Sequence, residues 1–330
     1  MPARGREEVA AALRIVREAD ASDSEKAEML MEVATNLQTK PRTPDEIDAA
    51  IDLYRAAIDV CPSGNALLSA RIRARLGTAL MASPTGGADA LAEARDELTD
   101  ALAVLSAQAG PEEVAEAEMN LGLALQSLAG AGRAPIKDAI GAYQRALRAF
   151  DRARHPKEYA ILQNNLATAF LSVSFADPGS RMREALAVQA FEEGLSAVAL
   201  VDHPSEYAML QNNLGNALQS VSSGHPVENG FRAIEAYREA LKVRNARDMP
   251  REYANTVANM ANCLAGLPDD PADETSGNAA NLREARSLLG EALAIFRAHG
   301  ETDKASEVAS VLAAIDADLE ATNPAAAVRH

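Results

Sequence analysis

Large aromatic residues are scarce in this sequence of 330 residues, which has no Trp, six Tyr and six Phe. Apolar residues still make up 48% of the chain, and much of that share is Ala and Leu. Strand-forming aromatic residues are therefore too few for an ordinary β-sheet, whereas Ala and Leu suit closely packed helices. The composition predicts an all-α protein.

Long apolar runs are also missing. The chain has no run of the roughly 18 apolar residues that marks a membrane-spanning helix. Its first segment, MPARGREEVAAALRIVREAD, is charged throughout and lacks the apolar core of a secretion signal. We therefore expect a cytoplasmic protein with no membrane partner.

Positive charge is limited, because 32 Lys and Arg residues stand against 48 Asp and Glu residues, for a formal net charge of −16. Phosphate backbones bind clustered Lys and Arg, so the sequence predicts no nucleic-acid partner. An acidic chain favours solubility and neutral or basic partners.

Residues that carry chemistry are few and do not cluster. Cys61 and Cys263 fit neither a disulfide nor a metal-ligand spacing, and His155 and His203 each precede a Pro, as turn residues do. The sequence contains no nucleophile elbow, phosphate loop or HExxH motif. We therefore expect no metal, no cofactor and no enzymatic activity.

What the sequence does contain is an internal repeat. The segments HPKEYAILQNNLATAF, from His155, and HPSEYAMLQNNLGNAL, from His203, share eleven of sixteen residues at a spacing of 48. Weaker copies span residues 24–37, 65–80, 111–125 and 250–264. A period of about 20–50 residues in an Ala-rich and Leu-rich chain predicts a helical solenoid, whose units bury their apolar faces against their neighbours.

A second pattern follows each copy and marks a second helix. It is Ala, then a bulky residue four positions later, then a small residue three positions after that. The six sets are Ala50-Tyr54-Ala57, Ala94-Leu98-Ala101, Ala139-Tyr143-Ala146, Ala187-Phe191-Gly194, Ala233-Tyr237-Ala240 and Ala285-Leu289-Ala292. These spacings place each set on one helical face, so we expect a packing seam.

The two patterns together predict one continuous array. Residues 1–22 form an N-terminal helix, residues 23–300 form six helix pairs, and residues 301–330 form a closing helix and a disordered tail. Three long connections, at residues 174–181, 222–230 and 268–281, are rich in Pro, Gly and Asp and should be surface loops. We expect the last to be the most mobile.

These motifs resemble the tetratricopeptide repeat. Leu76-Gly77, Leu121-Gly122 and Leu214-Gly215 match the end of its first helix, and the six sets above match its second helix. The long period and the Asn-Asn-Leu core are similar to the kinesin-light-chain style of the repeat, which is also found in bacterial multi-repeat proteins. The resemblance implies a right-handed α-solenoid that binds a peptide or protein in a concave groove lined by the first helices. It does not identify the partner.

A stripe of polar residues is predicted on the groove side of these first helices. With Leu166 as the buried reference and about 100° per residue, one face carries Asn120, Asn165, Thr168, Asn213, Asn216, Asn255, Asn259 and Asn262. An Asn side chain both donates and accepts, so it can pair with the backbone of an extended peptide. The resemblance implies this role for Asn165, Asn213 and Asn259. Alternatively, the amides hydrogen-bond to one another and order the stack.

Two further predictions concern neighbouring positions. Asn164 and Asn212 point away from the stripe, so we expect them to contact the following helix. Arg71 and Arg75 lie four apart on the predicted groove wall, where they can bind a carboxylate or phosphate. The alternative for the two arginines is ion pairing with Glu28 and Glu32, at the same positions one repeat earlier.

The leading hypothesis is a non-enzymatic adaptor that holds an extended peptide or protein partner in its groove. An alternative is a regulator in which a small molecule or peptide changes the compaction of the superhelix and thereby controls a partner. A third is a structural subunit whose Ala-rich ends pack on another copy as a homo-oligomer.

Overall fold

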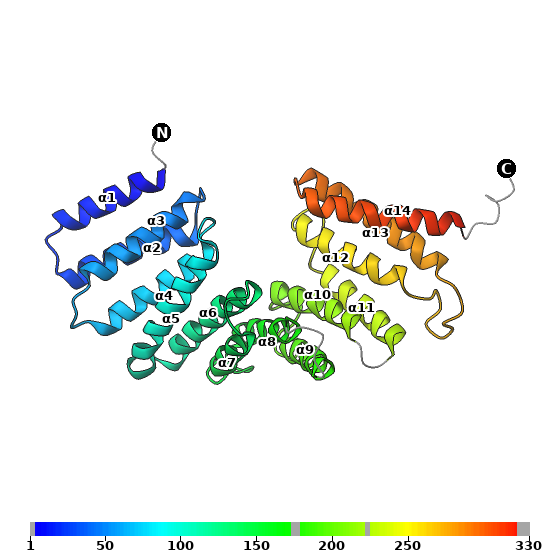
Figure 1. Ribbon diagram of the computed structural model, residues 1–330, viewed down its shortest axis with the longest axis horizontal. Helices are drawn as coiled ribbons and strands as arrows, with labels where there is room; N and C mark the ends of the chain where they lie inside the picture. Colours follow the sequence, from blue (N-terminus) through cyan, green and yellow to red (C-terminus); the bar gives the residue numbers. More distant parts are fainter. Residues whose placement is uncertain (1–3, 173–178, 222–224, 322–330) are drawn as a thin grey trace. The chain divides into compact units, whose positions relative to one another are not determined.

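The computed structural model of the chain describes residues 4–172, 179–221 and 225–321, and these contain fourteen α-helices and no β-strand (Figure 1). The helices are α1 (Arg4–Glu18), α2 (Asp23–Thr39), α3 (Asp45–Val60), α4 (Ala66–Ala82), α5 (Gly87–Gln108), α6 (Pro111–Gly130), α7 (Ile136–Ala146), α8 (Pro156–Leu171), α9 (Ser180–Leu195), α10 (Pro204–Ser220), α11 (Pro226–Leu241), α12 (Pro250–Ala265), α13 (Ala279–Ala298) and α14 (Thr302–Ala321). The predicted all-α fold is confirmed.

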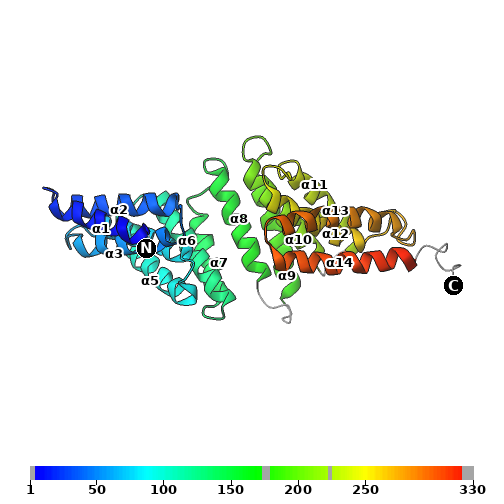
Figure 2. The same cartoon turned by 90° about the horizontal axis from the view of Figure 1, so that it is seen from above.

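The chain divides into two compact units, Met1–Asp151 and Arg152–His330. The first contains the pairs α2/α3, α4/α5 and α6/α7 after the single helix α1, and the second contains α8/α9, α10/α11 and α12/α13 before the single helix α14 (Figures 1 and 2). Within each unit, the first helix of a pair also packs against the first helix of the next pair. The predicted helical repeats are therefore present, but the sequence did not predict a division after Asp151.

The predicted packing seam is confirmed, because all eighteen residues of the six Ala, bulky and small sets are buried. In three of the six pairs, a glycine on the facing helix makes room for the bulky member. A Cβ atom on Gly215 of α10 would lie 2.6 Å from the Tyr237 ring, and one on Gly77 of α4 would lie 2.7 Å from Leu98. Gly122 of α6 meets the Tyr143 ring in the same way. In these three pairs, the Gly of the Leu-Gly motif thus provides the space into which the bulky residue of the second helix packs.

A hydrogen bond that the sequence reasoning missed completes three of these seams. The hydroxyl of Tyr54 donates to Gln38 Oε1 at 2.8 Å, and that of Tyr143 donates to Gln126 Oε1 at 2.7 Å. In the α10/α11 pair, Gln219 donates to the Tyr237 hydroxyl. The sequence could have predicted this hydrogen bond, because Gln occurs at the facing position only where the bulky residue is Tyr. Where the bulky residue is Leu or Phe and has no hydroxyl, the Gln position instead holds Met81, Leu171 or Ala265.

The turns before α8, α10 and α12 share one backbone geometry. His155, His203 and Met249 directly precede these helices with φ of −131°, −136° and −134° and ψ of 55°, 58° and 57°. Each is followed by a Pro at the first helical position, where its missing N–H costs nothing. The two histidines therefore occupy a structural turn, as predicted.

Of the predicted loops, the one between α12 and α13 lies fully within the described residues. It is tied by hydrogen bonds, since the Asp269 carboxylate accepts from the backbone of Ala280 at 3.0 Å and of Asn281 at 2.9 Å. Residues 173–178 and 222–224 of the other two loops, and the predicted tail from residue 322, lie outside the described residues. No described helix combines the length and apolar character that a bilayer span requires.

Candidate functional site

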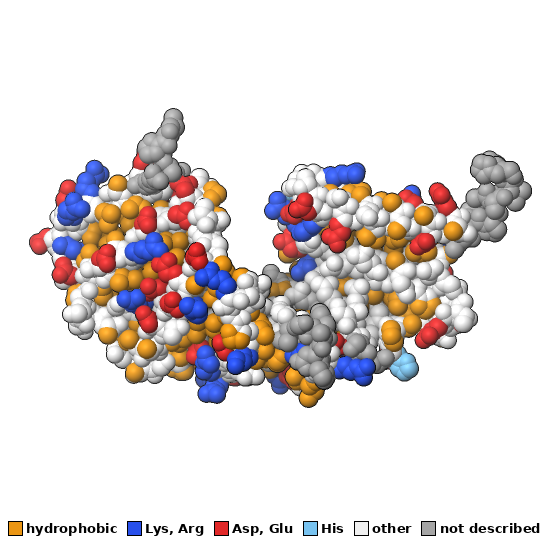
Figure 3. Space-filling model, viewed as in Figure 1, with side chains coloured by type: hydrophobic (Ala, Val, Ile, Leu, Met, Phe, Trp, Pro, Cys, Tyr) orange, Lys and Arg blue, Asp and Glu red, His pale blue; other side chains and the backbone are white. Residues whose placement is uncertain are grey.

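An uncharged polar surface runs along α8, α10 and α12 of the second unit, and we call it the amide face. It holds Asn165 and Thr168 on α8, Asn213 and Asn216 on α10, and Asn255, Asn259 and Asn262 on α12. The equivalent residues Asn165, Asn213 and Asn259 are half-buried, whereas Asn216 and Asn262 are exposed. In the space-filling view, the surface over α12 is almost free of charged side chains (Figure 3).

In two of the three repeats of the second unit, those of α8 and α10, the Asn side chains hydrogen-bond to one another in a row. We call this row the amide ladder. Asn213 Nδ2 on α10 donates to Asn164 Oδ1 on α8 at 2.8 Å. Within each helix, Asn164 donates to Asn165 at 3.2 Å and Asn212 donates to Asn213 at 3.1 Å. Asn164 and Asn212 are buried. Their predicted structural role is confirmed, and Asn165 and Asn213 also take part in the alternative arrangement, in which the amides bond to one another.

The ladder changes its chemistry at α12. The acceptor Asn212 Oδ1 is approached at 3.1 Å by the hydroxyl of Thr256, and Arg244 donates to that hydroxyl at 2.8 Å. One repeat earlier these two positions hold the buried apolar residues Leu210 and Val198. A polar pair therefore replaces an apolar pair, and the Arg244 Nε atom has no hydrogen-bond partner among the described residues.

The amides of α12 lie outside this ladder. In the preceding repeat, Asn213 bonds to Asn164, so the equivalent acceptor for Asn259 is Asn212. The Thr256 hydroxyl lies 3.1 Å from that oxygen and 2.9 Å from the Glu252 carbonyl, and Asn259 does not bond to Asn212. The side chains of Asn255, Asn259 and Asn262 make no hydrogen bond to any residue in the described ranges. They line an accessible face with their donors and acceptors free.

The remaining residues of the amide face are partly engaged. The Thr168 hydroxyl donates to the Asn164 carbonyl at 2.8 Å, and Asn216 Oδ1 accepts from the Tyr237 hydroxyl at 2.7 Å. An amide has two N–H groups and two lone pairs, so Asn213 keeps one N–H and Asn165 keeps both. Each of these side chains retains groups that can bind a ligand.

The first unit brings its three predicted site residues to one cleft of about 160 Å³. Arg71 and Arg75 enter it from α4 and Asn120 enters it from α6, beside Glu113 and Glu116. The cleft also borders Met31 of α2, so it spans the first helices of three successive pairs. This is the face on which the repeat pattern placed these residues, and it is charged where the amide face is neutral.

Arg71 forms an ion pair, but not with the predicted partner. Its Nε and Nη2 atoms donate to the two carboxylate oxygens of Glu113 at 2.7 and 3.0 Å. The alternative in which the arginines pair with Glu28 and Glu32 is wrong for Arg71, because its side chain turns toward the following helix and not the preceding one. Arg75 makes no ion pair with any described residue and is exposed.

The ion pair stabilises the charged forms of both partners. The hydrogen bond from Arg71 holds the pKa of Glu113 below its ordinary value of 4.5, and the field of Arg75 lowers it further. The same bond raises the pKa of Arg71. In the second unit, burial lowers the pKa of the Arg244 guanidinium, and the field of the Glu252 carboxylate offsets this only in part. Arg71 and Arg244 thus lie in opposite environments.

Groups with the potential for covalent or metal chemistry are not gathered in the described parts of the chain. Burial raises the pKa of the Cys263 thiol to about 11, and the thiol lies 3.4 Å from the Gly230 carbonyl. A thiol in such a position is not an activated nucleophile at neutral pH. Over the described ranges, no three His, Cys, Asp or Glu side chains are grouped so as to hold a metal ion.

Comparison with known proteins gives no sequence match, because no protein-family model and no curated protein matches the chain. Solved structures do match. BtubC (BKLC) from P. vanneervenii is similar with a TM-score of 0.51 at 16% identity, over 90% of this chain and 93% of that one. The C-terminal part of a TPR repeat-containing protein from Cytophaga hutchinsonii gives 0.50 at 13% identity, over 92% and 97%.

A third similar structure belongs to a larger protein. It is a signal-transduction ATPase with numerous domains and a tetratricopeptide repeat sensor from Pyrococcus horikoshii, with a TM-score of 0.50 at 12% identity. The similarity covers 88% of this chain and 43% of the ATPase. These structures show that the chain has the tetratricopeptide repeat fold, as its motifs predicted.

Proposed function

We propose that this protein is a non-enzymatic scaffold that binds an extended peptide or protein segment on the amide face of its second unit. The observation that carries the proposal is the set of unengaged amides on α12, Asn255, Asn259 and Asn262, next to a ladder that fixes Asn213 and Asn165. Amides on successive first helices present donors and acceptors that match the N–H and C=O groups of an extended chain.

The ladder supports binding by preorganisation. Asn164 and Asn212 hold Asn165 and Asn213 in place before any ligand arrives. A side chain that is already ordered loses less conformational entropy when it binds. The Asn259 side chain loses that entropy on binding, but both its N–H groups and its carbonyl oxygen are available. We therefore expect substitution of Asn259 to cause the largest loss of affinity.

The test uses peptides obtained by capturing partners from the native cell and then synthesised with a fluorescent label. Each lost amide contact costs about 1 kcal/mol, so Asn259→Ala with Asn262→Ala should weaken binding about 30-fold. Gln189→Ala is the matched control, since it removes an exposed amide from α9 of the same unit. Equal affinities of the double variant and the control would remove the amide face from the proposal.

The charged cleft of the first unit is proposed as a second contact for the same partner. Arg75 is exposed and unpaired among the described residues, so it can bind a carboxylate, and Asn120 can bind the adjacent backbone. Arg71 can bind the partner only if it breaks its ion pair with Glu113 or if its guanidinium contacts both groups at once. We therefore expect Arg75→Ala to weaken binding more than Arg71→Ala does.

The alternative function is a regulator that responds to a ligand with a change in compaction. Its supporting observation is the division into two compact units, because chains of several units can alter the separation of their units when a ligand binds. The repeats of the P. horikoshii ATPase are named a sensor. Small-angle scattering with and without the captured peptide tests this function, and an unchanged radius of gyration counts against it.

A further inference from the structure

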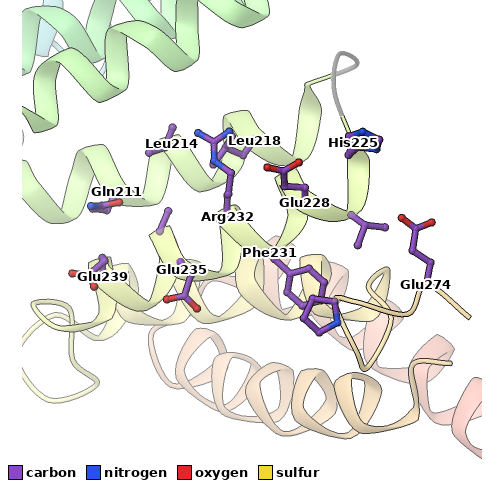
Figure 4. A pocket seen from close by; sticks show the side chains of 13 residues that line it. Gln211, Leu214, Leu218, His225, Glu228, Phe231, Arg232, Glu235, Glu239 and Glu274 are labelled. Carbon is purple, nitrogen blue, oxygen red and sulfur yellow. The ribbon is translucent and has the colours of Figure 1, made fainter. Parts of the chain in front are cut away.

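The second unit also contains a cavity, which lies away from the amide face. Its volume is about 660 Å³, and it is formed by α10, α11 and the connection between α12 and α13 (Figure 4). On α10 it is lined by Leu218, which lies two residues, or about 200° of helical rotation, from Asn216 of the amide face. The cavity and the amide face are therefore on nearly opposite sides of α10.

The floor of this cavity is apolar. Leu214 and Leu218 of α10 form one part, and Phe231 of α11 forms another beside Pro271 of the connection. Phe231 is only half-buried and Pro271 is exposed, so apolar surface remains open to solvent at this end. An apolar side chain from a partner gains free energy by covering such a surface.

The rim of the cavity is acidic. Glu228, Glu235 and Glu239 project from α11 and Glu274 projects from the connection (Figure 4). Glu235 pairs with Arg238 at 2.8 Å, and Glu239 accepts from Tyr207 at 2.8 Å and pairs with Lys242. Glu228 and Glu274 are exposed and form no ion pair or hydrogen bond with any residue in the described parts of the chain.

The single arginine on this rim does not balance these carboxylates. Arg232 is already paired with Glu192 of α9 at 2.9 Å. The connection adds Asp270 and Asp273 close to Glu274 in the sequence, and the chain as a whole carries a formal net charge of −16. The field at the cavity is therefore negative, which repels anionic ligands and draws cationic ones toward it.

We infer that this cavity binds a basic segment of a partner protein, in which an apolar side chain is flanked by Lys or Arg. The apolar side chain covers Leu214, Leu218 and Phe231. The flanking cations pair with Glu228 and Glu274, and one of them can also lie against the face of the Phe231 ring. This site is independent of the amide face, so neither proposal depends on the other.

The absence of Trp makes a direct test possible. The sequence has no Trp, so Phe231→Trp places a single indole reporter in the cavity. The probe is the peptide Lys-Lys-Leu-Leu-Lys-Lys, and the comparison peptide is Glu-Glu-Leu-Leu-Glu-Glu. We expect a saturable change in indole fluorescence with the basic peptide and none with the acidic one.

Two double variants, made in the Phe231→Trp protein, test which carboxylates bind the basic peptide. Glu228→Gln with Glu274→Gln should weaken the basic peptide about fivefold to tenfold at low salt, as the loss of two partly exposed ion pairs implies. Glu307→Gln with Glu320→Gln makes the same change in net charge on exposed positions of α14 and should alter affinity less than twofold. Asn259→Ala should have no effect.

Three outcomes overturn the inference. The first is a fluorescence response of equal size with the acidic peptide, or none with the basic one. The second is an equal loss of affinity in the two double variants, which would assign binding to net charge alone. The third is a fluorescence change that follows protein concentration without any peptide, which would assign the cavity to a second copy of this chain.

Discussion

The first helices of the repeats are joined by different chemistry in the two units. In the first unit, α4 and α6 are joined by the ion pair of Arg71 with Glu113, whose side chains are 44% and 33% exposed. In the second unit, α8 and α10 are joined by amides of which Asn164 is buried. The seam between the two helices is buried in every pair, although its bulky residue is Tyr, Leu or Phe. The seam therefore carries the fold, and the exposed faces of the first helices are free to differ.

The largest effect should come from breaking the shared seam. Gly122→Ala and Gly215→Ala push a Cβ atom into the fully buried rings of Tyr143 and Tyr237, which are also hydrogen-bonded. Overpacking of this kind costs about 1–3 kcal/mol, and we expect similar losses of unfolding free energy in the two units. Thermal unfolding measures the loss, and hydrogen exchange assigns it to a unit.

The control for the seam is another helical glycine. Gly290 lies within α13, and a Cβ atom there meets nothing within 4 Å. Gly290→Ala should stabilise the protein by about 0.5–1 kcal/mol, because Ala favours the helix. A gain from Gly122→Ala as large as that from Gly290→Ala would show that the seam has room to spare.

The next effect concerns the polar pair that interrupts the second unit. Thr256→Leu removes the hydroxyl to which Arg244 donates, and a stranded buried donor should cost about 1–3 kcal/mol. Adding Arg244→Val restores the apolar pair of the preceding repeat, Leu210 and Val198, and should recover the loss. Unfolding free energies of the single and double variants measure this coupling. A double variant no more stable than the single would contradict it.

A smaller effect is the pH dependence of stability, which should differ between the two units. The pKa of Glu113 is lowered in the folded chain, so its pairing with Arg71 stabilises the fold above pH 4.5 and loses that contribution as the pH falls through the folded pKa. Arg71→Gln should thus cost about 0.2–1 kcal/mol at neutral pH and progressively less in acid. The cost of Asn164→Ala should stay constant, since amides do not titrate. Urea unfolding at pH 7 and pH 3 compares the two variants.

The smallest difference is expected in the salt dependence of binding. Charges on an exposed wall are screened over about 8–10 Å at physiological ionic strength, whereas amide hydrogen bonds are not. Arg71→Glu with Arg75→Glu should therefore lower affinity mainly at low salt, and Asn213→Ala with Asn259→Ala at all salt concentrations. Titrations at two ionic strengths decide this, and equal salt dependence in the two variants would remove the distinction between the faces.

The sequence predicted the helices and their seam because burial repeats along the chain with a helical period. The Ala, bulky and small positions of each second helix must face the same neighbour in every repeat, so their burial followed from spacing alone. The same frame placed Asn165, Asn213 and Asn259 on one accessible face. The structure agrees with that placement, while their binding role stays a prediction.

Individual partners could not be predicted in this way. Arg71 has a long, flexible side chain that reaches either neighbouring helix, and the repeat frame does not choose between Glu32 behind it and Glu113 ahead of it. The repeat pattern does not single out Thr256, which the structure places beside Asn212 and Arg244. Such contacts depend on the rotation of each helix and on rotamers, which composition and period leave open.

The amide ladder has a direction, and this limits how far it can grow. Between helices, the donor lies on the later repeat: Asn213 of α10 donates to Asn164 of α8, and the Thr256 hydroxyl of α12 lies 3.1 Å from its acceptor Asn212 of α10. A repeat that carries the Asn-Asn pair accepts from the next repeat and donates to the one before, as α10 does. Thr256 ends this row of bonded amides at α12. Asn255, Asn259 and Asn262 lie beyond it and are not tied to one another, so the row of asparagines along the sequence is longer than the row of hydrogen bonds between them.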